Sequence, residues 1–112
     1  MRPDQALRWW KEVCLSQVTD RHPDLTLRQM TILLTIYLDP PPHTVRGLAA
    51  RLGVTKPVIT RALDTMGAMG LVDRRRDESD LRNVVIMRTV AGSLYLEQFA
   101  DTILAVRQEL HP

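Results

Sequence analysis

The sequence predicts a mostly α-helical fold with one small β-hairpin, an α+β arrangement, from three observations. Two short apolar patterns of helical period meet at Gly53, a residue that readily adopts the left-handed conformation that ends a helix. Two runs of β-forming residues, 71–76 and 84–87, then flank a polar turn at 77–83. Longer helical patterns lie on both sides. Two helices joined by a tight turn and followed by a hairpin define a winged helix-turn-helix, here with flanking N- and C-terminal helices.

Composition supports a single domain, 1–112. Hydrophobic residues make up 45% of the chain and aromatic residues only 4%, and a charged fraction of 25% argues against disorder. No run approaches the roughly 18 apolar residues of a membrane span, and the N-terminus lacks the apolar core of a signal peptide. We therefore expect a cytoplasmic protein. The single cysteine, Cys14, excludes an intramolecular disulfide and a cysteine-based structural zinc site.

Residues 4–43 predict two supporting helices. The first covers 4–19 and begins at Pro3 or Asp4, and a loop at 20–26 follows it. Thr26 and Gln29 form a capping-box pattern for a second helix over 27–38. The three consecutive prolines of segment 39–43 end that helix and stiffen the connector. The predicted core positions of the second helix are Met30, Leu33, Leu34 and Tyr37.

Residues 44–69 predict the helix-turn-helix. Its first helix places Leu48, Ala49 and Leu52 on one face and ends at Gly53. Its second helix covers about 55–69, with Thr55 expected to cap it and Pro57 in its first turn. Helical spacing turns one set of side chains inward: Ile59, Ala62, Leu63 and Met66. The opposite, polar face carries Pro57, Thr60, Arg61, Asp64 and Thr65. Such a helix suits the major groove of DNA.

The C-terminal helix is expected over 90–110, capped by Thr89. Both this helix and the first one carry apolar residues over a wider arc than packing within one small domain requires. The excess predicts a homodimer that buries the terminal helices. The expected dimerisation residues are Trp9, Trp10, Val13, Phe99, Ile103 and Val106. The chain thus divides into N-terminal supporting helices (4–43), a winged helix-turn-helix (44–89) and a C-terminal dimerisation helix (90–112).

Positive charge is concentrated in the winged helix-turn-helix. Segment 44–89 holds nine Lys and Arg against five Asp and Glu, whereas the rest of the chain holds six basic and eight acidic residues. The net charge of the whole chain is only +2. A basic central segment between mildly acidic flanks is typical of a protein that presents one face to a phosphate backbone.

The central segment resembles the MarR family of bacterial regulators. Four features carry the resemblance in order: the Leu48-Ala49 helix closed by Leu52-Gly53, the pair Thr60-Arg61, the sequence Gly70-Leu71-Val72 before the wing, and Asp80-Leu81-Arg82 followed by Thr89-Val90-Ala91-Gly92. The resemblance covers 44–92 well and the flanks loosely. It implies dimerisation through the terminal helices and a place in the bacterial cytoplasm or nucleoid. This chain differs in having room for one helix after the wing and in Arg88-Thr89, where the family usually has Leu-Thr.

The expected DNA contacts lie on the second helix and the wing. Arg61 can reach a guanine edge or a phosphate, and the alternative is an exposed arginine paired with Asp64 or Asp73. The resemblance implies that Arg82 enters the minor groove and that Asp80 helps to fix it. Consecutive strand residues alternate faces, so only one or two of Arg74, Arg75 and Arg76 reach phosphates, while one could pair with Asp77 or Asp80. The full predicted set is Thr55, Lys56, Pro57, Thr60, Arg61, Arg74, Arg75, Arg76 and Arg82, with Asp80 as wing support.

No cofactor, metal site or enzymatic activity is expected. His22, His43 and His111 are isolated from one another, and the sequence has no phosphate loop, nucleophile elbow or paired carboxylates. One branch of the family senses peroxide through a cysteine in its first helix, but the apolar neighbours of Cys14 favour an inert buried thiol. A small-molecule effector is compatible with the resemblance, yet no convergent polar cluster indicates one.

The sequence therefore predicts a sequence-specific regulator that binds double-stranded DNA as a homodimer, with no membrane partner. One alternative is a winged-helix adaptor that docks onto proteins, which would expose apolar residues where this chain is polar and basic. Another is an architectural DNA-binding protein, which differs in its ratio of specific to non-specific affinity rather than in its contacts.

Overall fold

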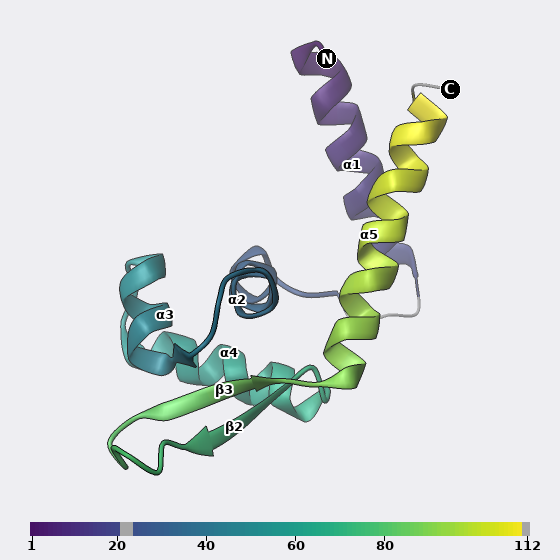
Figure 1. Cartoon of the computed structure of the whole chain (residues 1–112). Helices are drawn as coiled ribbons and strands as arrows, with labels where there is room; N and C mark the ends of the chain where they lie inside the picture. Colours follow the sequence, from purple (N-terminus) through teal and green to yellow (C-terminus); the bar gives the residue numbers. More distant parts are fainter. Residues whose placement is uncertain (21–23, 111–112) are drawn as a thin grey trace. The chain divides into compact units, whose positions relative to one another are not determined.

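Helices and strands follow the predicted order, with one strand added. The structure, a computed structural model, describes residues 1–20 and 24–110 (Figure 1). Its elements are α1 (Pro3–Thr19), α2 (Leu27–Leu38), β1 (His43–Thr44), α3 (Val45–Leu52), α4 (Lys56–Ala68), β2 (Val72–Arg76), β3 (Val84–Arg88) and α5 (Val90–Leu110). Part of the predicted loop at 20–26, including His22, and the C-terminal His111 lie outside the described residues. The prediction of a mostly helical fold with a wing is confirmed.

The chain forms two compact units. Unit 1 comprises Met1–Leu25 and Leu96–Pro112, and unit 2 comprises Thr26–Tyr95. Unit 2 therefore contains α2 together with the helix-turn-helix and the wing, and α5 begins in unit 2 and continues into unit 1. None of the helices within 1–20 and 24–110 is both long and apolar enough to span a membrane.

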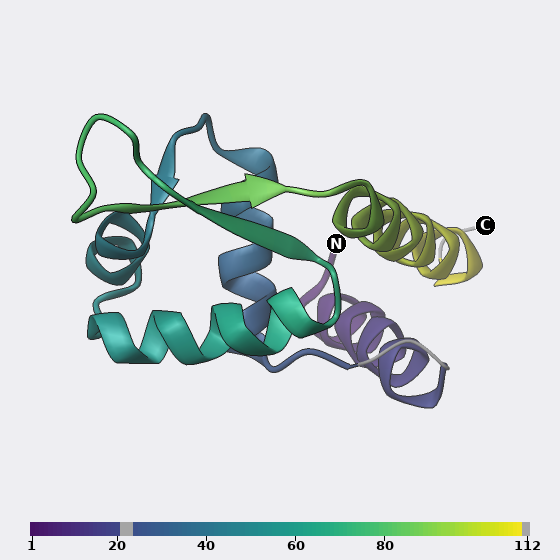
Figure 2. The same ribbon diagram turned by 90° about the horizontal axis from the view of Figure 1, so that it is seen from below.

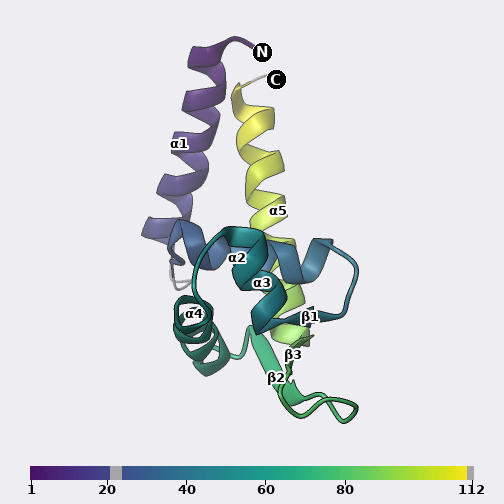
Figure 3. The ribbon, with the colours of Figure 1, turned by 90° about the vertical axis from the view of Figure 1, so that its left-hand side faces the viewer.

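In unit 1, α1 and the later part of α5 lie side by side and run in opposite directions (Figure 3). The indole Nε1 of Trp9 donates a hydrogen bond to the carbonyl oxygen of Ile103, 3.0 Å away. The guanidinium of Arg107 lies over the Trp9 ring, 5.9 Å from its centroid. Trp9 thus links the two helices of this unit.

Helix α2 supplies the centre of unit 2. The capping box is confirmed, because the Thr26 side chain accepts a hydrogen bond from the Gln29 backbone N–H and the Gln29 side chain accepts one from Thr26. The predicted core was partly wrong. Leu34 and Tyr37 are only half-buried, whereas Ile32 and Ile36 are fully buried with Leu33. The buried face of α2 therefore lies slightly around the helix from the predicted one, centred on Ile32, Leu33 and Ile36.

The helix-turn-helix forms as predicted, apart from one cap. Gly53 has a φ of 69°, the left-handed conformation that ends α3. The four inward residues of α4 are all buried: Ile59, Ala62, Leu63 and Met66. Thr55 is the N-cap residue, but its side chain makes no capping hydrogen bond. The reason is local: Pro57 has no N–H to donate, and the Val58 N–H donates to the Thr55 carbonyl oxygen instead.

The wing belongs to a three-stranded antiparallel sheet with strand order β1-β3-β2, not to an isolated hairpin. The short strand β1 places His43 opposite Ile86 and Thr44 opposite Val85. The β2–β3 ladder runs from Val72 opposite Arg88 to Arg76 opposite Val84. The sequence did not indicate β1, because two residues after a run of prolines are too few to show the alternation of a strand. By pairing with β3, β1 joins the helix-turn-helix to the wing.

Candidate nucleic-acid interface

The outer face of α4 is polar and exposed, as its sequence pattern predicts. Thr55, Lys56, Pro57, Thr60 and Arg61 are all exposed. The inward residues hold this face in place because they are buried against the rest of unit 2. Figure 2 shows α4 along one side of unit 2, next to the β2–β3 hairpin, and β2 contacts α4 directly. The arrangement presents a helix face and a hairpin from one small unit.

Three cations of this region have no partner among the described residues. The side chains of Lys56, Arg61 and Arg75 are exposed and form neither an ion pair nor a hydrogen bond within 1–20 and 24–110. The alternative in which Arg61 pairs with Asp64 or Asp73 is therefore not what the structure contains. Unpaired cations on a fixed scaffold are available to phosphate oxygens without first breaking an internal salt bridge.

Arg74 is held by the helix instead. Its Nη1 lies 2.7 Å from Oδ1 of Asp64 on α4, and its side chain is 35% exposed. The sheet register explains this, because Arg74 lies opposite the buried Ile86 and so faces the helix side of the sheet. One of the three consecutive arginines does form an ion pair, but the predicted partners, Asp77 and Asp80, were wrong: the partner is Asp64. Arg74 joins the wing to α4.

Arg75 and Arg76 differ in direction and in partners. Alternation along β2 turns Arg75 to the face opposite that of Arg74. Arg76 lies near the tip, where its Nη1 donates to the carbonyl oxygen of Leu81, 2.7 Å away. Alternation therefore separates Arg75 from Arg74 and Arg76, and these two differ from each other in their partners.

The wing tip contains the predicted pair of Asp80 and Arg82. Arg82 Nε lies 3.0 Å from Asp80 Oδ1, and Nη2 lies 3.1 Å from Oδ2, a two-point contact. The Arg82 side chain and then its backbone N–H lower the pKa of Asp80 below its usual 3.8, and the charge of Arg46 on α3 acts in the same direction. In return, the carboxylate of Asp80 raises the pKa of Arg82. The pair fixes the arginine while leaving it 84% exposed.

The turn that carries this pair is stabilised by its own side chains. Asp77 Oδ1 accepts hydrogen bonds from the backbone N–H and the hydroxyl of Ser79, at 2.9 and 2.7 Å. These bonds, the hydroxyl first, lower the pKa of Asp77. The Asn83 carbonyl oxygen accepts from the Asp77 N–H at 3.1 Å and closes the turn. The bonds that shape segment 77–83 are therefore local.

Two residues at the wing base have roles that the sequence did not predict: Arg88 at the end of β3, and Tyr37 on α2, which was predicted only as a core residue. Arg88 donates from Nε to the carbonyl oxygen of Ile36 and from Nη2 to that of Asp39. The hydroxyl of Tyr37 contacts Leu71, just before β2, and Thr89, just after β3, at the base of the β2–β3 ladder. No sequence pattern could have indicated these roles, because the partners are backbone atoms far away in the chain. The departure Arg88-Thr89 marks position 88 as unusual for the family but does not identify its partners.

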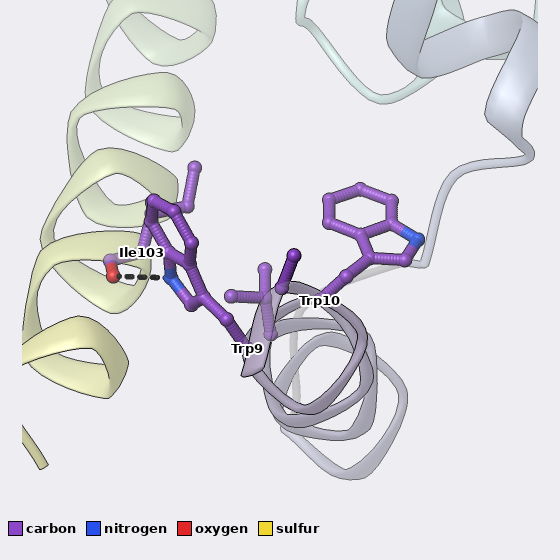
Figure 4. A pocket seen from close by; sticks show the side chains of 5 residues that line it. Trp9, Trp10 and Ile103 are labelled. Atoms are coloured by element: carbon purple, nitrogen blue, oxygen red, sulfur yellow. Dashed lines mark hydrogen bonds between the residues drawn. The ribbon is translucent and has the colours of Figure 1, made fainter. Parts of the chain in front are cut away.

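The six predicted dimerisation residues fall into different environments. Val13, Phe99 and Val106 are buried within the chain, Trp9 and Ile103 are half-buried, and Trp10 is 50% exposed. Figure 4 shows Trp9 reaching the helix that carries Ile103, while Trp10 points away from it. Ala6, Val13 and these three residues line a hollow of about 250 Å³ whose walls are apolar. Their role in a dimer stays a prediction.

Cys14, expected to be buried, is partly exposed on α1. His43 is buried, and its Nε2 lies 3.1 Å from the carbonyl oxygen of Asp39. In segments 1–20 and 24–110, no three His, Cys, Asp or Glu side chains are grouped in a way that could hold a metal ion.

Comparisons with known proteins agree with this geometry. The sequence profile of the MarR family matches residues 25–84. A MepR variant from S. aureus, solved bound to an oligodeoxyribonucleotide, is 22% identical, with a TM-score of 0.82 over 94% of this chain and 75% of that one. YusO from Bacillus subtilis is 20% identical, with a TM-score of 0.79 over 96% and 74%. A variant of MarR from E. coli is 27% identical, with a TM-score of 0.71 over 96% and 75%.

Proposed function

The chain belongs to the MarR family, and from this premise we propose that it is a transcription regulator that binds double-stranded DNA as a homodimer. The structures it resembles include MepR bound to DNA. The proposal rests mainly on one observation in this chain: the unpaired cations Lys56 and Arg61 lie on the exposed face of α4, next to a cationic hairpin.

In this proposal α4 enters the major groove and the wing lies along the adjoining minor groove. Arg61 reads a base edge, where a bidentate contact with guanine discriminates by about 1–3 kcal/mol. Thr55, Lys56, Pro57 and Thr60 add contacts around it. Arg82, fixed by Asp80, enters the minor groove, whose negative potential is concentrated where it is narrow. Two copies of α4 would bind half-sites separated by one helical turn, about 34 Å.

Arg75 has a different role in this proposal from Arg61. Arg75 is exposed on a strand and has no partner among the described residues, so it suits a phosphate contact that carries no sequence information. Arg74 and Arg76 have internal partners, and they support the wing while adding positive potential. Among the nine predicted residues, the proposal thus separates base reading by Arg61 from phosphate binding by Arg75 and from wing support by Arg74 and Arg76.

A salt titration of two variants tests this division. Duplexes are first selected from a random pool with the parent protein, and affinities are then measured from low to high salt. We expect Arg61→Ala to weaken specific binding and relax the preference at one base pair. Arg75→Ala should weaken binding to all sequences and reduce the salt slope by about one. Arg28→Ala on α2 removes the same charge outside the predicted set and serves as control.

Parent-like affinity and salt slope in both variants would contradict the interface. Binding of the parent to protein but not to any duplex would favour the docking adaptor. Binding to all duplexes with equal affinity would favour the architectural alternative.

The homodimer is proposed to use the part of the terminal helices that is still exposed. In unit 1 the exposed apolar side chains include Leu7 (71%), Trp10 (50%) and Val18 (61%) on α1 and Leu104 (61%) on α5. Leu7, Trp10 and Val18 recur at helical spacing on one side of α1. Sedimentation velocity of Trp10→Lys and Leu104→Lys should show a larger fraction of monomer. Leu38→Lys, at an equally exposed leucine (74%) in unit 2, is the control and should leave the dimer intact.

A further inference from the structure

The open end of the β2–β3 ladder is closed by one hydroxyl group from α2. Beyond the last strand pair, Val72 and Arg88, the Tyr37 hydroxyl donates to the carbonyl oxygen of Leu71 at 2.7 Å, with that of Thr89 at 3.2 Å. It accepts a hydrogen bond from the Thr89 N–H at 2.9 Å. One oxygen atom thus connects the residue before β2 with the residue after β3.

Arg88 makes a second connection between the wing and α2. At the end of β3, its Nε lies 2.8 Å from the carbonyl oxygen of Ile36 and its Nη2 lies 2.9 Å from that of Asp39. These oxygens belong to the C-terminal turn of α2, where carbonyls lack helical partners and carry partial negative charge. The guanidinium also lies over the Tyr37 ring, 5.9 Å from its centroid. Arg88 is therefore occupied by α2 and is not available to a phosphate.

The backbone of α5 at Gly92 packs closely against the Tyr37 hydroxyl and the Leu71 carbonyl oxygen. A Cβ atom added at Gly92 would overlap the Tyr37 hydroxyl and the Leu71 carbonyl oxygen. Thr89 Oγ1 donates to the Gly70 carbonyl oxygen at 2.7 Å and accepts from the Gly92 N–H at 2.9 Å. Tyr37 and Thr89 thus link the residues before β2 and after β3 with the first turn of α5.

Helix α2 connects this junction to the helix that reads DNA in our proposal. It contacts both β3 and α4, and Ile32, Leu33 and Ile36 are fully buried. The wing is therefore attached to the helix-turn-helix directly through Arg74 and Asp64, through the pairing of β1 with β3, and through α2 at the wing base. Because the turn at 77–83 is shaped only by local bonds, these attachments determine where the tip lies relative to α4.

We propose that Tyr37 and Arg88 are positioning residues that set the wing relative to α4 and so determine how strongly the protein prefers narrow, A·T-rich minor grooves next to its major-groove site. Neither residue touches DNA in this proposal; both act through Arg82. This role rests on the proposed function, because it concerns how Arg82 recognises the width of the minor groove. A stiffly held arginine can discriminate groove width, whereas a mobile one reaches wide and narrow grooves with similar ease.

A double-mutant cycle on the whole 112-residue chain tests this role of Tyr37 and Arg88. The probes are the duplex selected by the parent with its flanks made either A·T-rich or G·C-rich, and the readout is the ratio of the two dissociation constants. We expect Tyr37→Phe to reduce this ratio by about 2- to 10-fold, the range that corresponds to one hydrogen bond. Arg88→Leu should act in the same direction. In an Arg82→Ala background, Tyr37→Phe should change the ratio no further, because both act through the same contact.

Controls separate positioning from loss of folding. Thr31→Val removes another α2 hydroxyl, whose hydrogen bond is to the Leu27 carbonyl oxygen of its own helix, and should leave the ratio unchanged. Tyr37→Phe should keep the parent's base preference beneath α4. A destabilised protein with a smaller folded fraction would bind both flank probes more weakly by the same factor, so its flank ratio would not change. A change in the flank ratio therefore indicates positioning.

Each outcome has one meaning. A flank ratio that is unchanged in Tyr37→Phe, or effects of Tyr37→Phe and Arg82→Ala that add, overturns the inference while leaving the proposed function intact. If the parent shows no flank preference, or Arg82→Ala does not reduce it, the assignment of the wing to the minor groove is wrong, and the inference is wrong with it.

Discussion

At its base, the β2–β3 hairpin is joined to α2 by Tyr37 and Arg88, which bond to backbone atoms of other elements. At its tip, the hydrogen bonds that shape the turn stay within 76–83, and the charged pair of Asp80 and Arg82 is exposed. Exposed ion pairs contribute about 0–1 kcal/mol to stability. A buried or half-buried backbone group that loses its partner costs about 1–3 kcal/mol. We therefore expect substitutions at the base of the hairpin to lower the free energy of unfolding, and substitutions at its tip to change DNA affinity with little effect on that free energy.

The strongest way to break this contrast is Gly92→Ala. Alanine would gain about 1 kcal/mol in helix propensity, but its methyl group would overlap the Tyr37 hydroxyl and a backbone oxygen. Overpacking costs typically about 1–3 kcal/mol and more where backbone has to move, so we expect a net loss of about 2 kcal/mol. Chemical denaturation measures it. Ser93→Ala, the exposed neighbour in the same turn, should not destabilise. Equal stability of the two variants would contradict the close packing of the base.

Tyr37→Phe should have the next largest effect. It removes a single oxygen and leaves the Thr89 N–H and the Leu71 carbonyl without that partner. The expected loss of unfolding free energy is about 1–2 kcal/mol. The matched tip variant is Arg82→Ala, which should leave the unfolding free energy close to that of the parent because its ion pair is exposed to solvent. A larger loss at the tip than at the base would reverse the comparison.

A smaller difference in stability is expected between two Thr→Ala substitutions, one at the N-terminus of α5 and one at the N-terminus of α4. Thr89 Oγ1 accepts from the Gly92 N–H, so Thr89→Ala should cost about 1 kcal/mol. The Thr55 side chain makes no capping bond, and Thr55→Ala should change stability by less than about 0.5 kcal/mol. Thermal unfolding of both proteins tests the difference. A similar loss from both substitutions would show that Thr55 caps α4 after all.

The smallest effect concerns acid at the tip. Arg82 is the main cause that lowers the pKa of Asp80 below its usual value of 3.8. The stabilisation from the Asp80–Arg82 ion pair is therefore present above pH 3.8 and is lost only as the pH falls through the lowered pKa. The pair should therefore be fully formed from pH 5 to pH 8. An NMR titration of the Asp80 carboxyl carbon should give a midpoint below 3.8 that rises in Arg82→Ala. A midpoint at or above 3.8 in the parent would contradict the pair.

The sequence predicted those parts of the fold that depend on neighbours in the chain. The caps at Thr26 and Thr89 and the left-handed Gly53 set helix limits within a few residues, and the spacing of Ile59 and Leu63 identified the buried face of α4. These signals are local, so a single sequence contains them.

The missed features depend on contacts between distant elements. Strand β1 is defined by its pairing with β3, and Arg74 finds Asp64 only because the register turns it toward α4. The roles of Tyr37 and Arg88 require carbonyl groups 34 to 52 residues away. The candidate site was predicted as a set of exposed residues. The division of its arginines into paired and unpaired ones was not, because it needs coordinates.

The strand order β1-β3-β2 leaves the outer side of β2 without a neighbouring strand in unit 2. A free strand edge is a template for pairing with another chain, and charged side chains are a usual protection against it. Asp73, Arg74, Arg75 and Arg76 occupy four of the five positions of β2. The same arginines that give the wing its positive potential therefore also keep this edge from recruiting a strand of a second molecule, so replacing all three with apolar residues would lead to aggregation as well as to weaker DNA binding.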